Sequence, residues 1–159
     1  MKIDQLKNFL IEAAEHGYGA GVSSTLEKDT SHTIEYVSEN FKMHDNFFGG
    51  EPYGGREVVF YKGKPAWIMV YYGAVDSSTK DFNPVYEVLK KALMNFPKDL
   101  PLRGPASLKD GSFEYKNKWQ GNLASFSGKE IILKNGKEVY FANYSGGLVD
   151  QNFIVDENN

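Results

Sequence analysis

The chain has 159 residues, a formal net charge of −3 and a pI near 5.6, which argues against nucleic acid as a direct partner because phosphate binding draws its affinity from Lys and Arg. It contains no cysteine, so disulfides, thiolate catalysis and thiolate zinc sites are excluded. The N-terminus lacks the apolar core of a secretory signal and no apolar run is long enough to cross a bilayer, so we expect a soluble cytoplasmic protein with no membrane partner.

The first part of the chain predicts one helix followed by strands. Apolar residues recur at helical spacing over residues 3–14. The glycine-rich residues 17–21 lack the preceding strand, the Lys-Ser/Thr pair and the following helix of a phosphate-binding loop, and we interpret them as a plain loop. The pattern then alternates, which predicts a strand ending near Ser38 and another resuming near Phe41.

Two β-hairpins are indicated by their turns. Residues 58–61 and 66–72 are rich in β-branched and aromatic side chains and flank Lys62-Gly63, where a tight turn belongs. A second hairpin turns at Asn135-Gly136, a strong signal for a two-residue turn. Both faces of 66–72 are apolar, so we expect a central strand covered on both sides.

A second helix is predicted between the hairpins. Asn83-Pro84 starts it, an apolar stripe continues to Phe96, and Pro97 ends it. After a proline-rich connection, strands resume, with a turn expected at residues 120–122. The polar tail, residues 151–159, is expected to be disordered at its end.

One stretch of sequence occurs twice. Residues 56–75 match residues 129–148 without a gap at a constant offset of 73. The shared positions include Glu57 with Glu130, Tyr71 with Tyr144, and Gly73 with Gly146.

We therefore predict a single α+β domain over residues 1–159, made of two duplicated halves at about 1–76 and 77–150. Each half contributes a helix and about four strands to one strongly twisted antiparallel sheet with two main helices. A groove between the halves, lined by equivalent residues, is the expected place for a ligand. The second copy is more polar than the first at two matched positions, so a site built on the repeat should lean towards the first copy.

Four segments together resemble a bacterial domain family of unknown function. They are residues 44–55, 67–73, 102–105 and 146–148, and the resemblance runs from the first helix to about residue 150. Members of that family occur alone or C-terminal to an Xre-type helix-turn-helix. The resemblance implies a sensing or partner-binding half of a regulator and supplies no catalytic residues. This sequence contains no helix-turn-helix segment, so we expect no direct DNA reading.

No catalytic, metal or cofactor signature is present. The three histidines, His16, His32 and His44, lack the close spacing of a metal pair. Glu57 and Glu130 occupy equivalent positions of the repeat and could contribute to a symmetric site between the halves, but we favour the interpretation that they are charges on a solvent face. The candidate ligand-binding residues are His44, Glu51, Arg56, Trp67, Tyr71, Tyr72, Arg103 and Tyr144.

Arg103 has two interpretations. Its setting between prolines and a glycine would hold a guanidinium rigidly for a carboxylate or phosphate ligand. The interpretation that we favour is a salt bridge that clamps the connection to the sheet.

The sequence is compatible with three functions. We favour a non-enzymatic sensor or accessory domain that binds a small molecule or a protein. The alternative is a small-molecule hydrolase or isomerase that uses His44, Asp45, Glu51 and Arg103, which requires these four to meet in one pocket. The third is an oligomerisation or interaction module, for which a homodimer is the expected product.

Overall fold

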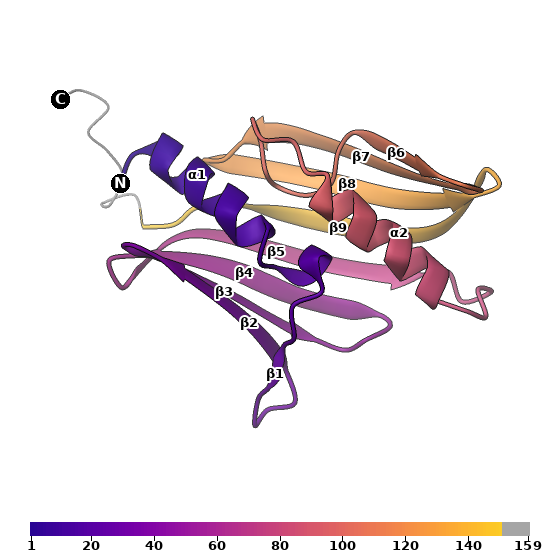
Figure 1. The fold of residues 1–159 in the computed structure, drawn as a ribbon, viewed down its shortest axis with the longest axis horizontal. Helices are drawn as coiled ribbons and strands as arrows, with labels where there is room; N and C mark the ends of the chain where they lie inside the picture. The colour runs from indigo at the N-terminus through magenta and orange to yellow at the C-terminus, as the bar shows by residue number, and fades with distance from the viewer. Residues whose placement is uncertain (151–159) are drawn as a thin grey trace.

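The computed structural model describes residues 1–150, and the expectation for the 151–159 tail lies outside the described residues. Residues 1–150 form two α-helices and one antiparallel sheet of nine strands, an α+β arrangement that is mostly sheet (Figure 1). The elements are α1 (Ile3–Ala14), the 3-10 helix η1 (Tyr18–Ala20), β1 (Thr25–Leu26), β2 (His32–Ser38), β3 (Phe41–Phe48), β4 (Tyr53–Tyr61), β5 (Lys64–Val75), α2 (Asn83–Met94), β6 (Ser107–Asp110), β7 (Phe113–Asn122), β8 (Ser125–Lys134) and β9 (Lys137–Leu148). The strand order is β1-β2-β3-β4-β5-β9-β8-β7-β6.

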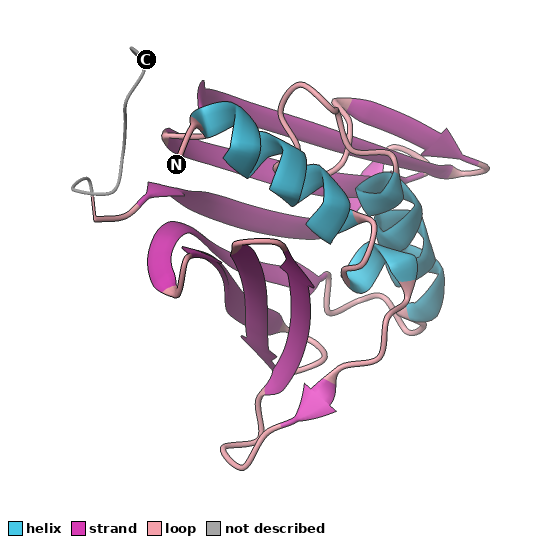
Figure 2. Cartoon of the chain, turned by 60° about the vertical axis from the view of Figure 1, so that its left-hand side comes forward, coloured by secondary structure: helices cyan, strands magenta, loops and turns pink. Residues whose placement is uncertain are grey.

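Both helices lie on one face of the sheet, here called the inner face (Figures 1 and 2). The apolar stripe of α1 shares a core cluster with residues of strands β2 to β5, β8 and β9, and that of α2 shares one with residues of β5 and β7 to β9. The buried residues of the two stripes are Leu6, Phe9, Leu10 and Ala13 in α1, and Val85, Val88, Leu89 and Ala92 in α2. The opposite face, here called the outer face, carries no helix from the described part of the chain. Burial of these two stripes is the main source of packing energy between the layers.

The central strand β5 is only half covered. It lies in the middle of the sheet, as expected, but Val70 is 46% exposed and Tyr72 is 50% exposed. The prediction that both sides are covered is therefore wrong. The outer face lacks a helix layer, so apolar residues on this side of β5 stay in contact with solvent.

The hairpin turns are confirmed. Lys62 and Gly63 have φ values of 50° and 78°, and Asn135 and Gly136 have 51° and 82°. Positive φ at both central residues is the signature of the turn that matches the twist of a hairpin. The break between Ser38 and Phe41 is confirmed as well.

The prediction of a turn at residues 120–122 is wrong. Strand β7 continues to Asn122, and the connection consists of Leu123 and Ala124. Gly121, with φ of 90°, pairs with Phe126 and lies so close to Ser125 that a Cβ would collide with its carbonyl oxygen. The glycine therefore permits a close backbone approach inside the hairpin rather than forming its turn.

The strand pairing of β3–β4–β5 recurs in β7–β8–β9. Asp45 pairs with Glu57 in the first set, and Asn117 pairs with Glu130 in the second. Both sets have a register shift in the same place, after Val59 and after Ile132. Positions 73 residues apart in β4, β5, β8 and β9 therefore occupy equivalent places in the sheet.

Candidate functional site

A cavity of about 300 Å³ lies on the inner face, between the sheet and the segments around α2. We call it the inner cavity. Strands β3, β4 and β5 contribute to its wall, together with η1, α2 and the connection after α2. Its lining residues are Tyr18, Asp45, Phe47, Gly49, Gly50, Tyr53, Glu57, Tyr71, Asn83, Tyr86, Glu87, Leu89, Lys90, Leu93 and Arg103. A smaller hollow of about 80 Å³ towards α1 shares Asp45, Glu57 and Arg103 with it.

Two carboxyl groups, here called the acid pair, stand next to each other in the wall of the inner cavity. Asp45 on β3 is the direct cross-strand partner of Glu57 on β4, a relationship that places Cβ atoms roughly 5 Å apart. Burial first, and then the charge of Asp45, raise the pKa of Glu57 to about 8, against the opposing effect of Arg103. Among residues 1–150, the Glu57 carboxyl has no hydrogen-bond or ion-pair partner, so its polar atoms are left to the cavity.

Asp45 is held by a tyrosine. The Tyr71 hydroxyl donates a hydrogen bond of 2.5 Å to Asp45 Oδ1. Burial raises the pKa of Asp45, although this hydrogen bond acts in the opposite direction. Burial also raises the pKa of Tyr71, so its hydroxyl keeps its proton. A Cβ at Gly55 would stand 2.7 Å from the Tyr71 hydroxyl oxygen, so the ring reaches Asp45 only because glycine lies beneath it.

A third carboxyl group near the cavity, that of Glu130, is fully paired. Arg103 donates two hydrogen bonds to Glu130, from Nε at 3.2 Å and from Nη2 at 2.5 Å. The Tyr115 hydroxyl at 2.6 Å and the Tyr140 hydroxyl at 3.0 Å also donate to this carboxylate. Glu130 is 0% exposed, and the salt bridge fastens the connection after α2 to β8, as favoured for Arg103.

The expectation that Glu57 and Glu130 lie on a solvent face is wrong. Glu57 alternates in phase with Val59, and Glu130 with Ile132, and both apolar residues are 0% exposed on the inner face. The period of two along a strand therefore carries both glutamates inward.

The two equivalent glutamates have different surroundings. Tyr115 and Tyr140, which donate to Glu130, are replaced around Glu57 by Met43 and Trp67, according to the strand register. Asp45 likewise takes the place of Asn117, whose Oδ1 accepts a hydrogen bond of 2.8 Å from Tyr144. The second half thus neutralises its carboxylate internally. The first half presents two carboxyl groups to the cavity.

Tyrosines form much of the remaining wall. The ring centroid of Tyr53 lies 6.0 Å from that of Tyr71 and 6.3 Å from that of Tyr86. The Tyr86 hydroxyl donates to Glu51 Oε2 at 2.6 Å, while Glu51 Oε1 accepts the amide of Val75 at 2.8 Å. The Tyr53 hydroxyl is hydrogen-bonded to that of Tyr140, and burial raises the pKa of Tyr53 to about 12.

The candidate residues named from the sequence do not form one site. Tyr71 and Arg103 line the inner cavity, and Glu51 is bonded to its wall through Tyr86. Trp67 is buried with its indole N–H donating to Leu123 O at 3.0 Å, and Tyr144 is buried against Asn117.

Three further candidates lie on the outer face. His44 and Arg56 border a hollow across β3 and β4, and Tyr72 borders another hollow over β5 and β9. His44 is therefore on the opposite side of the sheet from Asp45 and Arg103. The four residues of the hydrolase or isomerase alternative do not meet in one pocket.

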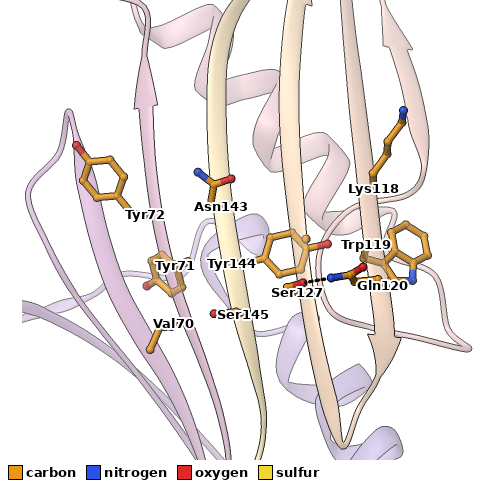
Figure 3. Close-up of a pocket in the computed structure, with 11 residues that line it drawn as sticks. Val70, Tyr71, Tyr72, Lys118, Trp119, Gln120, Ser127, Asn143, Tyr144 and Ser145 are labelled. Carbon is orange, nitrogen blue, oxygen red and sulfur yellow. Dashed lines mark hydrogen bonds between the residues drawn. The ribbon is translucent and has the colours of Figure 1, made fainter.

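The hollow at Tyr72, here called the outer groove, is broad and open. It crosses β5, β9, β8 and β7, and its side chains are mixed, with Val70 and Tyr72 on one side and Asn143 and Lys118 further across (Figure 3). A hydrogen bond of 3.0 Å joins Gln120 Nε2 to the Ser127 hydroxyl in its floor. The outer groove contains no acid pair or buried ion pair comparable with those of the inner cavity.

Glu57 was expected on a solvent face rather than in a site, and Tyr53 and Tyr86 were not among the candidate residues named from the sequence. A signal for the acid pair was present, because Asp45 alternates in phase with Met43 and Phe47, and Glu57 with Val59. A charged residue in the apolar phase of a strand indicates a buried polar group. Tyr86 has no such signal, since its role depends on where α2 docks.

The described residues, 1–150, contain no group of three His, Asp or Glu side chains arranged to hold a metal ion. None of the helices in this range is long and apolar enough to cross a membrane. A family model described as Domain of unknown function (DUF5680) matches residues 45–149, about two thirds of the chain. The match starts at Asp45 and includes Glu57, Tyr71 and Arg103. No curated protein and no solved structure matches the chain.

Proposed function

The chain belongs to the DUF5680 family of domains of unknown function, and from the geometry of its site we propose that it binds a small molecule in the inner cavity. The observation that carries the proposal is the Glu57 carboxyl, which is half-buried on the inner face, borders the cavity and has no hydrogen-bond or ion-pair partner among residues 1–150. Ligand sites in proteins are concave, largely apolar and equipped with a few polar groups of this kind. A volume of about 300 Å³ is at the small end of their usual range.

The energetics of burial support this proposal. A polar group taken out of water without a partner costs free energy, and an ionised one costs more. Glu130 offsets this cost through Arg103 and two tyrosines, whereas the half-buried Glu57 has no such partner among residues 1–150 and bears the part of the cost that its access to the cavity does not relieve. A ligand that completes the interactions of Glu57 would recover this free energy on binding.

We also propose that the two halves arose by duplication and then diverged in role. The constant offset of 73 and the matching strand register support this origin. In the second half the acidic position fastens the connection after α2 to the sheet, and in the first half it is left for a ligand. The resemblance to domains fused to Xre-type helix-turn-helix regulators supports a sensing or accessory role in the bacterial cytoplasm.

A second candidate function is acid–base catalysis on the bound molecule. The specific observation is a carboxyl with a pKa of about 8 directly beside a second carboxyl, because catalytic acids and bases have pKa values near the working pH. This version uses Glu57 and Asp45, not His44. It differs from pure binding in one measurable way, since the ligand would be converted on incubation.

The proposal is tested by a thermal-shift screen with two variants as controls. Gly50 is exposed, borders the inner cavity and has no heavy atom within 4 Å of its Cβ position, so Gly50→Phe adds a ring at the edge of the cavity without a clash at Cβ. Ser145→Phe, the control variant, adds a ring in the exposed outer groove.

A compound that binds the native state at a hundred times its Kd should stabilise it by about 2.7 kcal/mol. We expect the shift of a true ligand to be lost in Gly50→Phe and kept in Ser145→Phe. The reverse pattern would place binding in the outer groove and refute the proposal. Analysis of the recovered compound by mass spectrometry then separates binding from conversion.

A further inference from the structure

The charge and aromatic content of the inner cavity define the class of its ligand. We infer that the ligand is a small organic amine in its cationic form, with its N–H groups held between Asp45 and Glu57 and its apolar part against the tyrosine rings. This inference rests on the proposed function, because it assumes that the inner cavity is the binding site.

The charge balance of the cavity favours a cation. Three carboxyl groups, Asp45, Glu57 and Glu130, lie around the single guanidinium of Arg103. Arg103 gives its hydrogen bonds to Glu130, so the acid pair has no cation in contact among residues 1–150. A positive group placed between two carboxylates in a desolvated site experiences a stronger attraction than it would in water.

The Lys90 ammonium, which borders the inner cavity, is already paired. Lys90 pairs with Glu87 at 3.1 Å, so this pair adds no net charge to the cavity. An anionic ligand would therefore find Arg103 and Lys90 engaged and would face the acid pair. The inner cavity disfavours anions for this reason.

The aromatic wall suits the same ligand. The rings of Tyr18, Phe47, Tyr53, Tyr71 and Tyr86 border the cavity. The hydroxyls of Tyr53, Tyr71 and Tyr86 are already bonded to Tyr140, Asp45 and Glu51, so these residues offer mainly their rings to a ligand. Ring faces attract cations and also pack on apolar groups.

Two features narrow the class further. A volume of about 300 Å³ corresponds to about ten groups the size of a water molecule, taking about 30 Å³ for each. Two opposed carboxyl groups accept hydrogen bonds, so the cation needs N–H donors, which a quaternary ammonium lacks. A primary or secondary amine on a short chain or single ring satisfies both conditions.

Binding of such a cation is coupled to proton release. Burial and Asp45 raise the pKa of Glu57 to about 8, so near pH 7 the free protein holds a proton that an ammonium group would displace. The other charged and titratable groups that line the cavity with Glu57 are Asp45 on β3, Tyr53 on β4, Tyr71 on β5, Tyr18 on η1, Tyr86, Glu87 and Lys90 on α2, and Arg103. In the hollow towards α1, that helix contributes Leu10, Ala13 and Ala14, none of which titrates.

The displacement of the Glu57 proton sets the direction in which pH changes the affinity for the cation. Below pH 8 the cation competes with one proton, so its affinity should fall by about tenfold for each pH unit. An uncharged ligand that accepts the Glu57 proton as a hydrogen bond would show the opposite trend, because its binding requires the protonated form.

The test uses isothermal titration calorimetry with matched probes. Benzylamine and 1,4-diaminobutane serve as amines, benzyl alcohol as the neutral analogue, benzoate as the anionic one and benzyltrimethylammonium as the cation without N–H groups. We expect both amines to bind at pH 8 and at least tenfold more weakly at pH 6.5. Comparison of phosphate and Tris buffers should show the release of about half a proton at pH 8 and about 0.9 proton at pH 7. Each of the other three probes should bind at least tenfold more weakly than benzylamine.

Two variants and a control locate the site. Glu57→Gln should weaken amine binding by at least tenfold and abolish proton release. Asp45→Asn should weaken it while keeping the Tyr71 hydrogen bond, because Asn117 accepts the same bond from Tyr144 in the second half. Glu35→Gln, in an exposed pair with Lys42 on β2 and β3, should leave amine binding within twofold of the wild type.

The outcomes separate this inference from the proposed function. If benzyl alcohol or benzoate binds as well as the amines and loses binding in Gly50→Phe, the cavity is a binding site and the cation inference is refuted. Amine binding that is unchanged in both Gly50→Phe and Glu57→Gln would refute both. Failure of benzylamine and 1,4-diaminobutane to bind at millimolar concentration would overturn the cation inference alone.

Discussion

Tyr71 and Tyr144 face each other in register at the centre of the sheet, on the neighbouring strands β5 and β9. Each donates its hydroxyl proton to a side-chain oxygen two strands away, Tyr71 to Asp45 and Tyr144 to Asn117. The backbone arrangement is the same on both sides, and the acceptors differ by one charge. Together with the replacement of Tyr115 and Tyr140 by Met43 and Trp67, this difference separates the half that presents the acid pair to the cavity from the half whose carboxylate is neutralised.

The first prediction exchanges the two acceptors. Asp45→Asn removes a buried charge next to Glu57 and keeps the Tyr71 bond, so we expect a stability gain of about 1 kcal/mol at pH 8. Asn117→Asp adds a carboxyl beside Glu130 and removes the Nδ2 donor to Gly104 O, so we expect a loss of about 3 kcal/mol. Urea unfolding followed by circular dichroism measures both. Equal losses in the two variants would contradict the assigned difference between the halves.

The second prediction concerns the salt bridge between Arg103 and Glu130. Arg103→Met leaves a carboxylate buried with no cation, so the free energy of unfolding should fall by about 3 to 5 kcal/mol. The double variant with Glu130→Gln should regain more than half of this loss, because the uncompensated charge is then absent. Chemical denaturation of the two single variants and the double variant gives the coupling energy. Additive losses would show that the pair does not act as a unit.

The repeat and the hairpin turns could be predicted from the sequence because they depend on local signals. Asn135-Gly136 and Lys62-Gly63 require positive φ, and glycine makes this conformation accessible. The acid pair was only partly predictable. Alternation places Asp45 and Glu57 on the inner face, but their pairing depends on the register between β3 and β4. The salt bridge of Arg103 to the sheet was predicted from its setting between prolines and a glycine, but its partner Glu130 and the contribution of Tyr86 could not be foreseen, since they depend on where α2 and the following connection dock on the sheet.

The third prediction compares the two central tyrosines. Tyr71→Phe removes a hydrogen bond to a carboxylate, and Tyr144→Phe removes one to a neutral amide. Hydrogen bonds to charged groups contribute about 1.5 to 3 kcal/mol and neutral ones about 1 kcal/mol, so we expect the larger loss at Tyr71 when Asp45 is ionised. Thermal and urea unfolding at pH 8 provides the comparison. In an Asp45→Asn background the two losses should become similar, and a persistent difference would point to packing instead.

The last prediction is a fall in stability with rising pH that is specific to Glu57. Its pKa is about 8 in the folded protein, against an ordinary value of 4.5, so the folded state binds its proton more tightly than the unfolded state does. The stabilising contribution is therefore fully present below about pH 4.5 and is lost as the pH rises through 8. A shift of this size corresponds to a few kcal/mol at most, and partial access of the residue to the cavity reduces the expected loss to about 2 kcal/mol between pH 5 and pH 8.5.

Asp45 contributes with the same sign because burial also raises its pKa, whereas Asp29 and Asp76, whose pKa values are lowered, titrate below this window. Urea unfolding at several pH values measures the slope. Glu57→Gln should flatten most of it and the exposed-site control Glu35→Gln should not, so a slope that survives in Glu57→Gln would show that Glu57 is not the titrating group.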